Sequence, residues 1–452
     1  MRLRKTITTI VATAILLAGW QLFAVIANQP ELIPSLPRLV RTLCEWLVSG
    51  SFYQSVGATI LRGILGMSIS FVCAIGMAGL FARFEWVYEL FRPLLAIMRS
   101  IPVISFILLA LIFLNPESIP LMIAFLTMFP LLTENLTRGI LDLRPGLSIM
   151  ARQFHIKCSN VLFQIIYPQL KPFLYSGLAS AAGFGWRAII MGEVLSQCAF
   201  GIGSEMKRAQ NFIAVPELLA WTIVAVFISF FFDKGISKVA DITPKISFAN
   251  EDQTTPTPTL SVLDTKDISY QYGIQHFSHS FQKGIIYGIS APSGKGKTTL
   301  LNLIGGILLP TEGEIHPTRH FGIATIFQQP QLLPHLTAEE NIILPLSSFL
   351  TEEKARRIAQ KHLQEMEMEP FGNRYPKELS YGQQQRIAIA RALAYPSPLL
   401  LRDEPFKGLD EALSHRIIER IREMQMKEER IILFTSHNPD EIRLLADEVI
   451  YL

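Results

Sequence analysis

Gly284-Ile-Ile-Tyr-Gly-Ile-Ser-Ala-Pro-Ser-Gly-Lys-Gly-Lys-Thr298 is the stretch that decides the fold of the C-terminal half of the chain. Its first seven residues are typical of a buried strand, its glycine-rich centre of a turn, and residues 299–304 of an apolar helix. The end of the stretch matches the phosphate-loop pattern G-x4-G-K-S/T, except that Ala291 stands at the first glycine. Such a loop closes backbone N–H groups around phosphate oxygens at a helix N-terminus, so we expect an α/β domain that binds a nucleotide.

Residue types in this loop suit particular parts of a nucleotide. A lysine reaches the β- and γ-phosphates, and a hydroxyl group after it can bind Mg²⁺. Two glycines give the backbone the freedom that the turn needs. The predicted phosphate site therefore consists of Ser293, Gly294, Gly296, Lys297, Thr298 and Thr299.

A pair of carboxylates follows about a hundred residues later, where residues 399–401 read as a strand that ends in Arg402-Asp403-Glu404-Pro405. An Asp-Glu pair at a strand end is often only a solvated turn. A parallel sheet, however, places the carboxyl ends of its strands beside the phosphate loop. We therefore expect Asp403 to hold Mg²⁺ and Glu404 to reach the water that attacks the γ-phosphate.

The N-terminal half has a different composition. The whole chain has 452 residues, is 50% hydrophobic and has a mean hydropathy of +0.32, too high for an ordinary soluble enzyme. Residues 1–240 contain 19 Lys/Arg and 11 Asp/Glu, whereas residues 241–452 contain 22 and 27. This excludes a disordered chain and a nucleic-acid binder recognised by overall basicity. Six apolar segments are each long enough to cross a bilayer as a helix, near 7–27, 55–81, 93–114, 118–138, 172–194 and 214–232.

Lys and Arg residues gather on one side of these six predicted spans, which places both ends of the chain in the cytoplasm. No clear cleavage site follows Ala27, so we expect the first span to be retained. Four ionisable residues lie in or beside the spans and serve either as structural polar contacts or in translocation: Arg62, Arg99, Arg187 and Glu193. The four cysteines are scattered and suggest neither a zinc site nor a disulfide framework.

The sequence thus predicts three parts: a transmembrane domain over 1–240, a Thr/Pro-rich linker over 241–259, and a nucleotide-binding domain over 260–452. The fold class is a membrane all-α domain with six transmembrane helices plus a soluble α/β P-loop ATPase domain.

Residues 260–452 resemble an ABC-transporter ATPase domain. Besides the phosphate loop and the Asp-Glu strand, four further motifs follow in the family's order: Phe327-Gln328 (Q-loop), Leu379-Ser-Tyr-Gly-Gln383 (LSGGQ signature), Gly408-Leu-Asp410 (D-loop) and Ser436-His437 (switch histidine). Tyr272 matches the aromatic residue that stacks on adenine in this family.

This resemblance implies ATP and Mg²⁺ as cofactors. Thr298 and Gln328 would contact Mg²⁺ together with Asp403, Glu404 would polarise the attacking water, and His437 would contact the γ-phosphate region. Ser380 and Gly382 would contact the ATP held by a second copy of the chain, so the chain would work as a homodimer, and Gln383 and Asp410 would also bind the nucleotide. Three positions depart from the family pattern and leave slow hydrolysis possible: Ala291, Tyr381 and Arg402.

Residues 144–171 resemble the cytoplasmic coupling loop of type I bacterial ABC import permeases, EAA-x3-G-x9-I-x-LP. The matching positions read Ile149-Met150-Ala151, His155, Ile165 and Tyr167-Pro168, so the spacing survives without the Glu, the Gly and the Leu. A short amphipathic interfacial helix would produce much of the same pattern. In the family this loop forms a short helix docked beside the Q-loop, which here contains Gln328.

Arg99-Ser-Ile-Pro102 and Trp186-Arg187 followed by Glu193 resemble the permeases of the nitrate, sulfonate, taurine and pyrimidine-precursor group. The implied protein is a fused importer half-unit in the lipid of the cytoplasmic membrane. It would work with an extracytoplasmic solute-binding protein and without nucleic acid. An ABC exporter and a membrane-anchored regulatory ATPase are the alternatives, and the transported solute cannot be read from the sequence.

Overall fold

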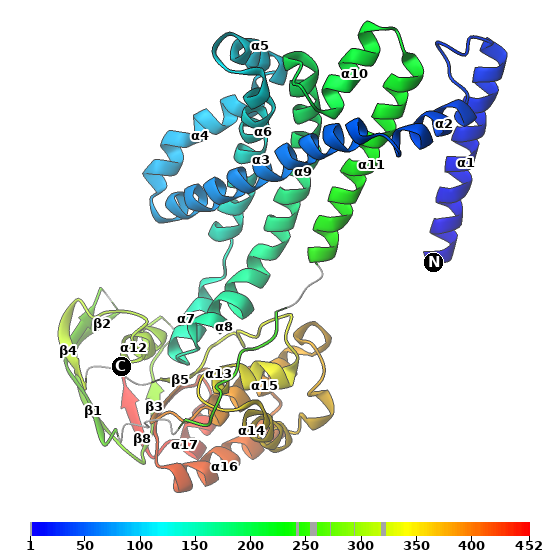
Figure 1. The fold of residues 1–452 in the computed structure, drawn as a ribbon. Helices are drawn as coiled ribbons and strands as arrows, with labels where there is room; N and C mark the ends of the chain where they lie inside the picture. Colours follow the sequence, from blue (N-terminus) through cyan, green and yellow to red (C-terminus); the bar gives the residue numbers. More distant parts are fainter. Residues whose placement is uncertain (1, 241–243, 254–259, 272, 293, 318–321) are drawn as a thin grey trace. The chain divides into compact units, whose positions relative to one another are not determined.

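The computed structural model describes residues 2–240, 244–253, 260–271, 273–292, 294–317 and 322–452, and the chain forms two compact units. The helical unit consists of residues 1–143 and 169–243, and the sheet unit of residues 144–168 and 244–452 (Figure 1). Loop 144–168 is therefore part of the sheet unit, although the residues on either side of it belong to the helical unit.

Long helices make up the helical unit. Several contain glycine, alanine or serine where neighbouring helices approach each other; a Cβ at Gly66 of α3, for example, would lie 2.6 Å from the Cβ of Ala124 in α6. The elements are α1 (Arg2–Ala27), α2 (Leu36–Trp46), α3 (Gly50–Arg83), α4 (Glu85–Ser100), α5 (Val103–Phe113), η1 (Pro116–Ser118), α6 (Ile119–Leu141), α9 (Tyr167–Ser196), α10 (Ile202–Asn211) and α11 (Val215–Ala240).

Among the described residues, four helical segments are long and apolar enough to cross a membrane: Gly50–Arg83, Pro116–Leu141, Cys158–Ser196 and Val215–Val239. Helices α4 and α5 form a fifth span if they are counted together, and Val11–Ala27 is a shorter apolar helix. The prediction of a membrane all-α domain is confirmed.

The span predicted over 93–114 is not a single straight helix. Helices α4 and α5 meet at a bend of 94°. Pro102 lies at the break, and Ile101 before it is extended, with φ −70° and ψ 130°. A proline has no backbone N–H to donate and disfavours helical geometry at the residue before it, which accounts for the break.

The sheet unit begins with the three short elements of loop 144–168: α7 (Pro145–Gln153), α8 (Cys158–Asn160) and the π-helical turn η2 (Val161–Ile166). The strands that follow are β1 (Val262–Tyr270), β2 (Ile274–Gln282), β3 (Ile286–Ser290), β4 (Glu312–His316), β5 (Ala324–Ile326), β6 (Leu399–Asp403), β7 (Ile431–Thr435) and β8 (Glu448–Tyr451). The remaining helical elements are α12 (Lys297–Gly305), α13 (Ala338–Leu346), α14 (Glu352–Glu365), η3 (Glu369–Phe371), η4 (Pro376–Glu378), α15 (Tyr381–Ala394), α16 (Glu411–Glu428) and α17 (Pro439–Leu445).

Two sheets organise this unit. One is five-stranded with parallel pairings in the order β5-β6-β7-β3-β8, and the other is antiparallel in the order β2-β1-β4. The predicted α/β domain is confirmed. Strand β7 separates the carboxylate strand β6 from the phosphate-loop strand β3, so the carboxyl ends of all three strands meet at one edge.

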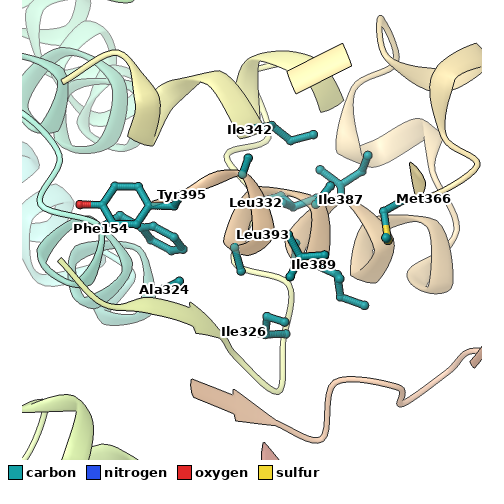
Figure 2. Close-up of a cluster of buried hydrophobic side chains, with 14 of the residues drawn as sticks. Phe154, Ala324, Ile326, Leu332, Ile342, Met366, Ile387, Ile389, Leu393 and Tyr395 are labelled. Carbon is teal, nitrogen blue, oxygen red and sulfur yellow. The ribbon is translucent and has the colours of Figure 1, made fainter. Parts of the chain in front are cut away.

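The largest apolar core of the sheet unit includes residues of loop 144–168. Figure 2 shows Phe154 of this loop beside Tyr395, in a cluster with Ala324, Ile326 and Leu393. Phe154 has no exposed surface. Burying a phenylalanine side chain contributes about 1.5–3 kcal/mol, so the loop is held by the same hydrophobic effect that stabilises the rest of the core.

Candidate functional site

The phosphate loop connects β3 to α12. Gly294 and Gly296 have φ angles of +81° and +86°, in the region that favours glycine. A Cβ at Gly296 would also lie 2.6 Å from the carbonyl oxygen of Gly273, so a larger residue does not fit there. Within the described part of the chain, Ala291 is not among the residues with positive φ, and the alanine therefore suits its position.

The structure describes most, but not all, of the residues predicted to bind the nucleotide in and near this loop. Lys297 is buried and its Nζ donates to the carbonyl oxygen of Ala291 at 2.6 Å. Thr298 and Thr299 lie in the first turn of α12. Tyr272 and Ser293 lie outside the described residues.

Asp403, at the end of β6, is held by two hydroxyl groups. Thr298 Oγ1 donates to its Oδ2 at 3.0 Å, and Thr435 Oγ1 donates to its Oδ1 at 2.9 Å. Thr435 is the β7 residue opposite Asp403 in the parallel register, and its Oγ1 also accepts from the backbone N–H of Glu404 at 3.1 Å. The three elements α12, β6 and β7 thus share one polar cluster.

Glu404 is the centre of a second cluster. Its carboxylate lies 2.9 Å from His437 Nε2, 3.0 Å from Lys407 Nζ and 3.3 Å from Gln328 Nε2. Its φ of +49° is unusual for a residue other than glycine. Strained backbone of this kind often occurs at functional positions.

Partial burial of Glu404 acts to raise the pKa of its carboxyl group, but hydrogen bonds from Lys407 and Gln328 outweigh burial and hold that pKa below its usual range. The same contact with Glu404 raises the pKa of Lys407. The carboxylate is therefore charged at neutral pH, as a group that orients a water molecule must be.

The donor set at this edge fits a magnesium ion that keeps water and phosphate ligands. It offers the hydroxyl of Thr298, the carboxylate of Asp403 and the amide of Gln328. Mg²⁺ prefers oxygen ligands and is usually held by one or two protein groups together with substrate phosphates. No group of three or more His, Cys, Asp and Glu residues that could hold a metal occurs in the part of the chain that the structure describes.

Residues of the predicted signature lie at the start of α15. Ser380 is the N-cap: its Oγ accepts from Gln383 N–H at 3.3 Å, and Gln383 Oε1 accepts from Ser380 N–H at 2.9 Å. A Cβ at Gly382 would lie 2.9 Å from the carbonyl oxygen of Gly408. Asp410 likewise caps α16 by accepting from Leu413 N–H at 2.8 Å. Gln383 and Asp410 thus serve local helix capping.

Tyr381, which replaces the first signature glycine, connects three motifs. Its hydroxyl donates to the backbone carbonyl of Gln328 at 2.8 Å. Its ring lies against Gly408, whose added Cβ would be only 2.8 Å from the ring. The substitution therefore joins the signature of one chain to the Q-loop and the D-loop of the same chain.

Sequence reasoning missed three residues that belong to this arrangement: Lys407, Thr435 and Arg391. Thr435 directly precedes Ser436-His437 at the end of a strand, and this position could have marked it as a site residue from the sequence alone. Lys407 follows Glu404 by three residues in a loop, and only the fold shows that it turns back toward the carboxylate.

Arg391 links loop 144–168 to the Q-loop segment. Its guanidinium lies 5.5 Å from the ring centre of Phe154, and it donates to the carbonyl oxygens of Gln331 at 2.8 Å and Pro330 at 2.9 Å. Burial lowers the pKa of Arg391 to about 10 and raises that of its neighbour Tyr395 to about 12. Phe154 thus packs on the side chain that holds the Q-loop segment.

The rest of loop 144–168 makes polar contacts of its own. Gln153 Nε2 donates to the carbonyl oxygen of Gly305 at 2.6 Å, and its backbone carbonyl accepts from Ile323 N–H at 2.8 Å. His155, at the glycine position of the import-permease pattern, has φ +46°. The left-handed geometry that favours glycine is therefore present without the glycine.

Helix α7 of this loop lies beside the Q-loop segment. A Cβ at Gly146 would lie 2.6 Å from Gln331 Oε1, and Gly146 and Ile149 line a cavity of about 310 Å³ together with Gln328 and Asp403. Ala151 is buried in the apolar core of the unit.

Three of the four ionisable residues noted in the spans, Arg62, Arg99 and Glu193, have charged partners. Glu193 is fully buried; its carboxylate lies 2.7 Å from Arg62 Nη1 and accepts from Thr59 Oγ1 at 2.9 Å and Gly203 N–H at 3.0 Å. Arg99 pairs with Glu134, and Arg187 is exposed. These contacts support a structural role for Glu193, because a charged side chain within a membrane span is usually accommodated by an ion pair and hydrogen bonds.

Two family models match the chain. Residues 56–233 match the binding-protein-dependent transport system inner membrane component, and residues 274–407 match the ABC transporter. An uncharacterized ABC transporter ATP-binding protein of Methanocaldococcus jannaschii is 34% identical over 201 residues, which is 40% of this chain and 85% of that protein.

Two relatives with named substrates are similar to the same half. The thiamine import ATP-binding protein ThiQ of Yersinia pseudotuberculosis is 34% identical over 205 residues, 42% of this chain and 86% of that protein. The Fe(3+) ions import ATP-binding protein FbpC of Rhizobium etli is 35% identical over 189 residues, 40% of this chain. The chain spans 54% of the length of this last relative.

Proposed function

Because the chain belongs to the ABC transporter family, with a permease domain and an ATP-hydrolysing domain in one membrane-embedded polypeptide, we propose that it imports a small solute. The observation that carries the proposal is the pair of family matches on one chain, since the matched permease belongs to binding-protein-dependent systems. An extracytoplasmic solute-binding protein would deliver the solute. Residues 1–240 would form the permease domain in the cytoplasmic membrane. The linker 241–259 would follow, and residues 260–452 would lie in the cytoplasm.

The nucleotide edge, which we define as Thr298, Gln328, Asp403, Glu404 and His437, would bind and hydrolyse ATP. Lys297 and the loop amides would hold the phosphates at the start of α12. Mg²⁺ held by Thr298, Asp403 and Gln328 would neutralise charge on the phosphate oxygens.

The side chains of the edge then have separate tasks. Glu404 would orient the attacking water, because its lowered pKa keeps it charged. His437 and Lys407 lie within 3.0 Å of the same carboxylate and would fix its direction. Thr435 would hold Asp403 at the end of β6.

Two copies of the chain would form the working transporter. In this arrangement Ser380 and Gly382 of one copy face the ATP on the phosphate loop of the other, so each chain supplies two half-sites. The N-terminal position of Ser380 on α15 supports this, because backbone N–H groups at a helix start favour an anion.

Mixed dimers test this arrangement. Chains with Lys297→Ala are co-expressed with chains carrying Ser380→Arg, and ATP hydrolysis by the purified mixture is measured. One site of the mixed dimer then carries both lesions and the other is intact, so activity should partly return.

The double mutant mixed with wild type is the control, because each site of that mixed dimer carries one lesion. Recovery only in the control, beyond what wild-type homodimers explain, would mean that each chain closes its own site. The homodimer part of the proposal would then be wrong.

Import itself is tested in proteoliposomes with the solute-binding protein that the host secretes. That protein should stimulate ATP hydrolysis, and solute should accumulate on the side of the membrane that holds the ATPase domain. Ala151→Glu should reduce accumulation far more than hydrolysis, because a charge would enter the buried contact of loop 144–168. Hydrolysis that is indifferent to every such protein would favour a regulatory ATPase.

A further inference from the structure

Residues 244–253, which we call the strap, belong to the sheet unit and lie in the chain between α11 and β1. Pro244, Ile246 and Phe248 are half-buried, whereas Lys245 and Ser247 are exposed. This alternation is typical of extended chain with one face on a surface. Ile246 and Phe248 pack against the main apolar core of the sheet unit. The strap is thus docked along this part of its length.

The first half of the strap is hydrogen-bonded to loop 144–168. Asn160 Oδ1 accepts from Ser247 N–H, and Asn160 Nδ2 donates to the Ser247 carbonyl oxygen, both at 2.8 Å. Gln164 Nε2 donates to the carbonyl oxygen of Pro244 at 3.0 Å. Asn160 is 1% exposed and Gln164 is fully buried. Buried bonds of this kind are costly to break, because the separated groups lose their partners without gaining water.

Asn160 also reaches the ATPase domain directly. Its Nδ2 lies 2.8 Å from Ser347 Oγ, just after α13, and the backbone N–H of Lys157 donates to Ser348 Oγ at 2.9 Å. One amide side chain therefore binds the strap and the ATPase domain together. Loop 144–168, the strap and residues 347–348 form a joint of three segments.

The second half of the strap is bound to the segment that leads into α14. Gln253 N–H donates to the carbonyl oxygen of Phe349 at 2.8 Å. Asp252 Oδ1 accepts from the N–H of Thr351 at 2.9 Å and from its hydroxyl at 3.0 Å. These bonds, the backbone N–H of Thr351 first, lower the pKa of Asp252, so its carboxylate is charged when it holds this segment.

We propose that the strap holds each ATPase domain on loop 144–168 of its own chain, so that in the dimer every ATPase domain drives the permease domain to which it is fused. The six residues from Ser247 to Asp252 are joined by five Cα–Cα steps, which span at most about 18 Å. With both ends bound, the ATPase domain has to sit beside its own loop. A swapped arrangement requires one end of the strap to come free, at the cost of the bonds to Asn160 or to Thr351. This inference rests on the proposed dimeric transporter.

Sequence length alone leaves both arrangements open. A free linker over 241–259 would reach about 65 Å when fully extended, far enough for an ATPase domain to serve either permease. The bonds at Ser247, Asp252 and Gln253 remove that freedom for most of the linker. The fusion of the two domains then has two effects. It keeps the permease and ATPase domains at equal numbers, and it determines which permease domain each ATPase domain docks on.

A cysteine pair tests the docking partner. Lys157→Cys and Ser348→Cys, which leave Asn160 in place, are introduced into one full-length chain whose four native cysteines are serine, and membranes are oxidised before a non-reducing gel. Most of the cross-linked protein should run at monomer mass, with both thiols lost to maleimide labelling. As a control, two co-expressed chains that carry one of these cysteines each should give little dimer band.

A dominant dimer band from the co-expressed chains would show swapped docking and overturn the proposal. Absence of any cross-link would overturn it as well, since Lys157 and Ser348 are hydrogen-bonded to each other. Neither readout needs ATP hydrolysis or transport. A chain that cross-links internally but imports nothing would therefore refute the proposed function and leave the strap intact.

The strap's own contribution is measured by cleavage. A protease site is inserted between residues 254 and 259 of the full-length chain, and the membranes are cut and washed. The ATPase fragment should stay on the membranes, whereas Ser247→Pro combined with Asp252→Ala should release it several-fold more readily. Glu251→Ala, which removes a charge one residue away in the strap, is the matched control. Equal release from both variants would mean that the strap does not hold the domain.

Discussion

The nucleotide edge and the joint around loop 144–168 belong to the same compact unit but are built in opposite ways. At the edge, charged side chains satisfy one another while partly open to water: the side chain of Glu404 is 17% exposed and that of its partner His437 53%. In the joint, Phe154 has no exposed surface and Asn160 has 1%. In the proposed function the edge exchanges its partners for phosphate and water, whereas the joint keeps its partners while the edge changes. Substitutions at the edge should therefore change rates, and substitutions in the joint should change stability and coupling.

Glu404→Gln should have the largest effect on the rate of ATP hydrolysis, and it tests whether the nucleotide edge is catalytic. In the proposed function Glu404 orients the attacking water, so its loss should slow ATP hydrolysis by about 10²-fold to 10³-fold or more, by analogy with the removal of other groups that stabilise a transition state. ATP binding should persist, because the proposed phosphate contacts of Lys297 and Thr298 do not involve Glu404. Single-turnover hydrolysis and equilibrium binding of labelled ATP separate the two quantities.

Lys297→Ala is the counterpart at the same edge, since it should weaken nucleotide binding itself. If Glu404→Gln hydrolyses ATP at a near-normal rate in purified protein, the assignment of Glu404 is wrong.

Phe154→Ala tests the other side of the comparison. A fully buried phenylalanine that becomes alanine leaves a cavity and typically costs about 3–5 kcal/mol of stability. Here the cavity would lie between Tyr395 and Arg391, so transport should fall more than ATP hydrolysis, and the chain should unfold at a lower temperature.

Phe163→Ala in the same loop is the matched control, because Phe163 is 49% exposed. Equal losses from the two variants would show that the joint does not depend on the buried ring.

The edge was largely predictable from the sequence, and the joint was not. Phosphate binding requires glycine, lysine and hydroxyl residues at fixed spacing, so Gly296, Lys297 and Thr298 stand out in a single sequence. The contacts of the joint connect residues far apart in the chain. Asn160 meets Ser347, and Phe154 meets Tyr395, because the fold brings them together. No local pattern announces such a pair.

The positions that depart from the family patterns also differ in what the sequence reveals and what only the fold reveals. His155 takes the left-handed geometry of a missing glycine, and Tyr381 replaces a glycine but gains a hydrogen bond to Gln328. The sequence marks both positions as exceptions, but the contact that Tyr381 makes is visible only in three dimensions. The span predicted over 93–114 consists of two helices that meet at Pro102 with a bend of 94°, and the sequence does not indicate the size of that bend.

Tyr381→Phe should have an intermediate effect on ATP hydrolysis, and it tests the contact between the signature and Gln328 of the nucleotide edge. It removes one hydrogen bond to the backbone of Gln328, worth about 1 kcal/mol, and leaves the ring on Gly408. We expect a change of about fivefold in the rate of ATP hydrolysis, with ATP affinity nearly unchanged. Tyr451→Phe, at a tyrosine that is 79% exposed, is the control. An unchanged rate would mean that the hydroxyl does not restrain the Q-loop.

Arg402→Met should have the smallest effect, and it separates two arginines buried in the same unit. Arg391 donates to two carbonyl oxygens, whereas, within the described part of the chain, none of the three guanidinium nitrogens of Arg402 has a hydrogen-bond partner. Replacing an unpaired buried charge by an apolar side chain of similar length should leave the unfolding temperature unchanged or raise it, by an amount that corresponds to no more than about 1–2 kcal/mol. Arg391→Met should lower it, because two carbonyl groups lose their donor.

The pH dependence of this difference sharpens the test. Burial, with a smaller contribution from the charge of Arg430, lowers the pKa of Arg402 in the folded chain to about 9, well below the value of an arginine in the unfolded chain. Above pH 9 the unfolded chain therefore holds a proton that the folded chain has released, and folded wild type gains stability relative to the variant as the pH rises. The advantage of Arg402→Met should be fully present below pH 9 and shrink between pH 9 and pH 10.5. Thermal unfolding of both proteins in the same detergent at pH 7.5 and pH 10 measures it. A variant that is as unstable as Arg391→Met at pH 7.5 would show that Arg402 has a structural partner, and the contrast between the two arginines would disappear.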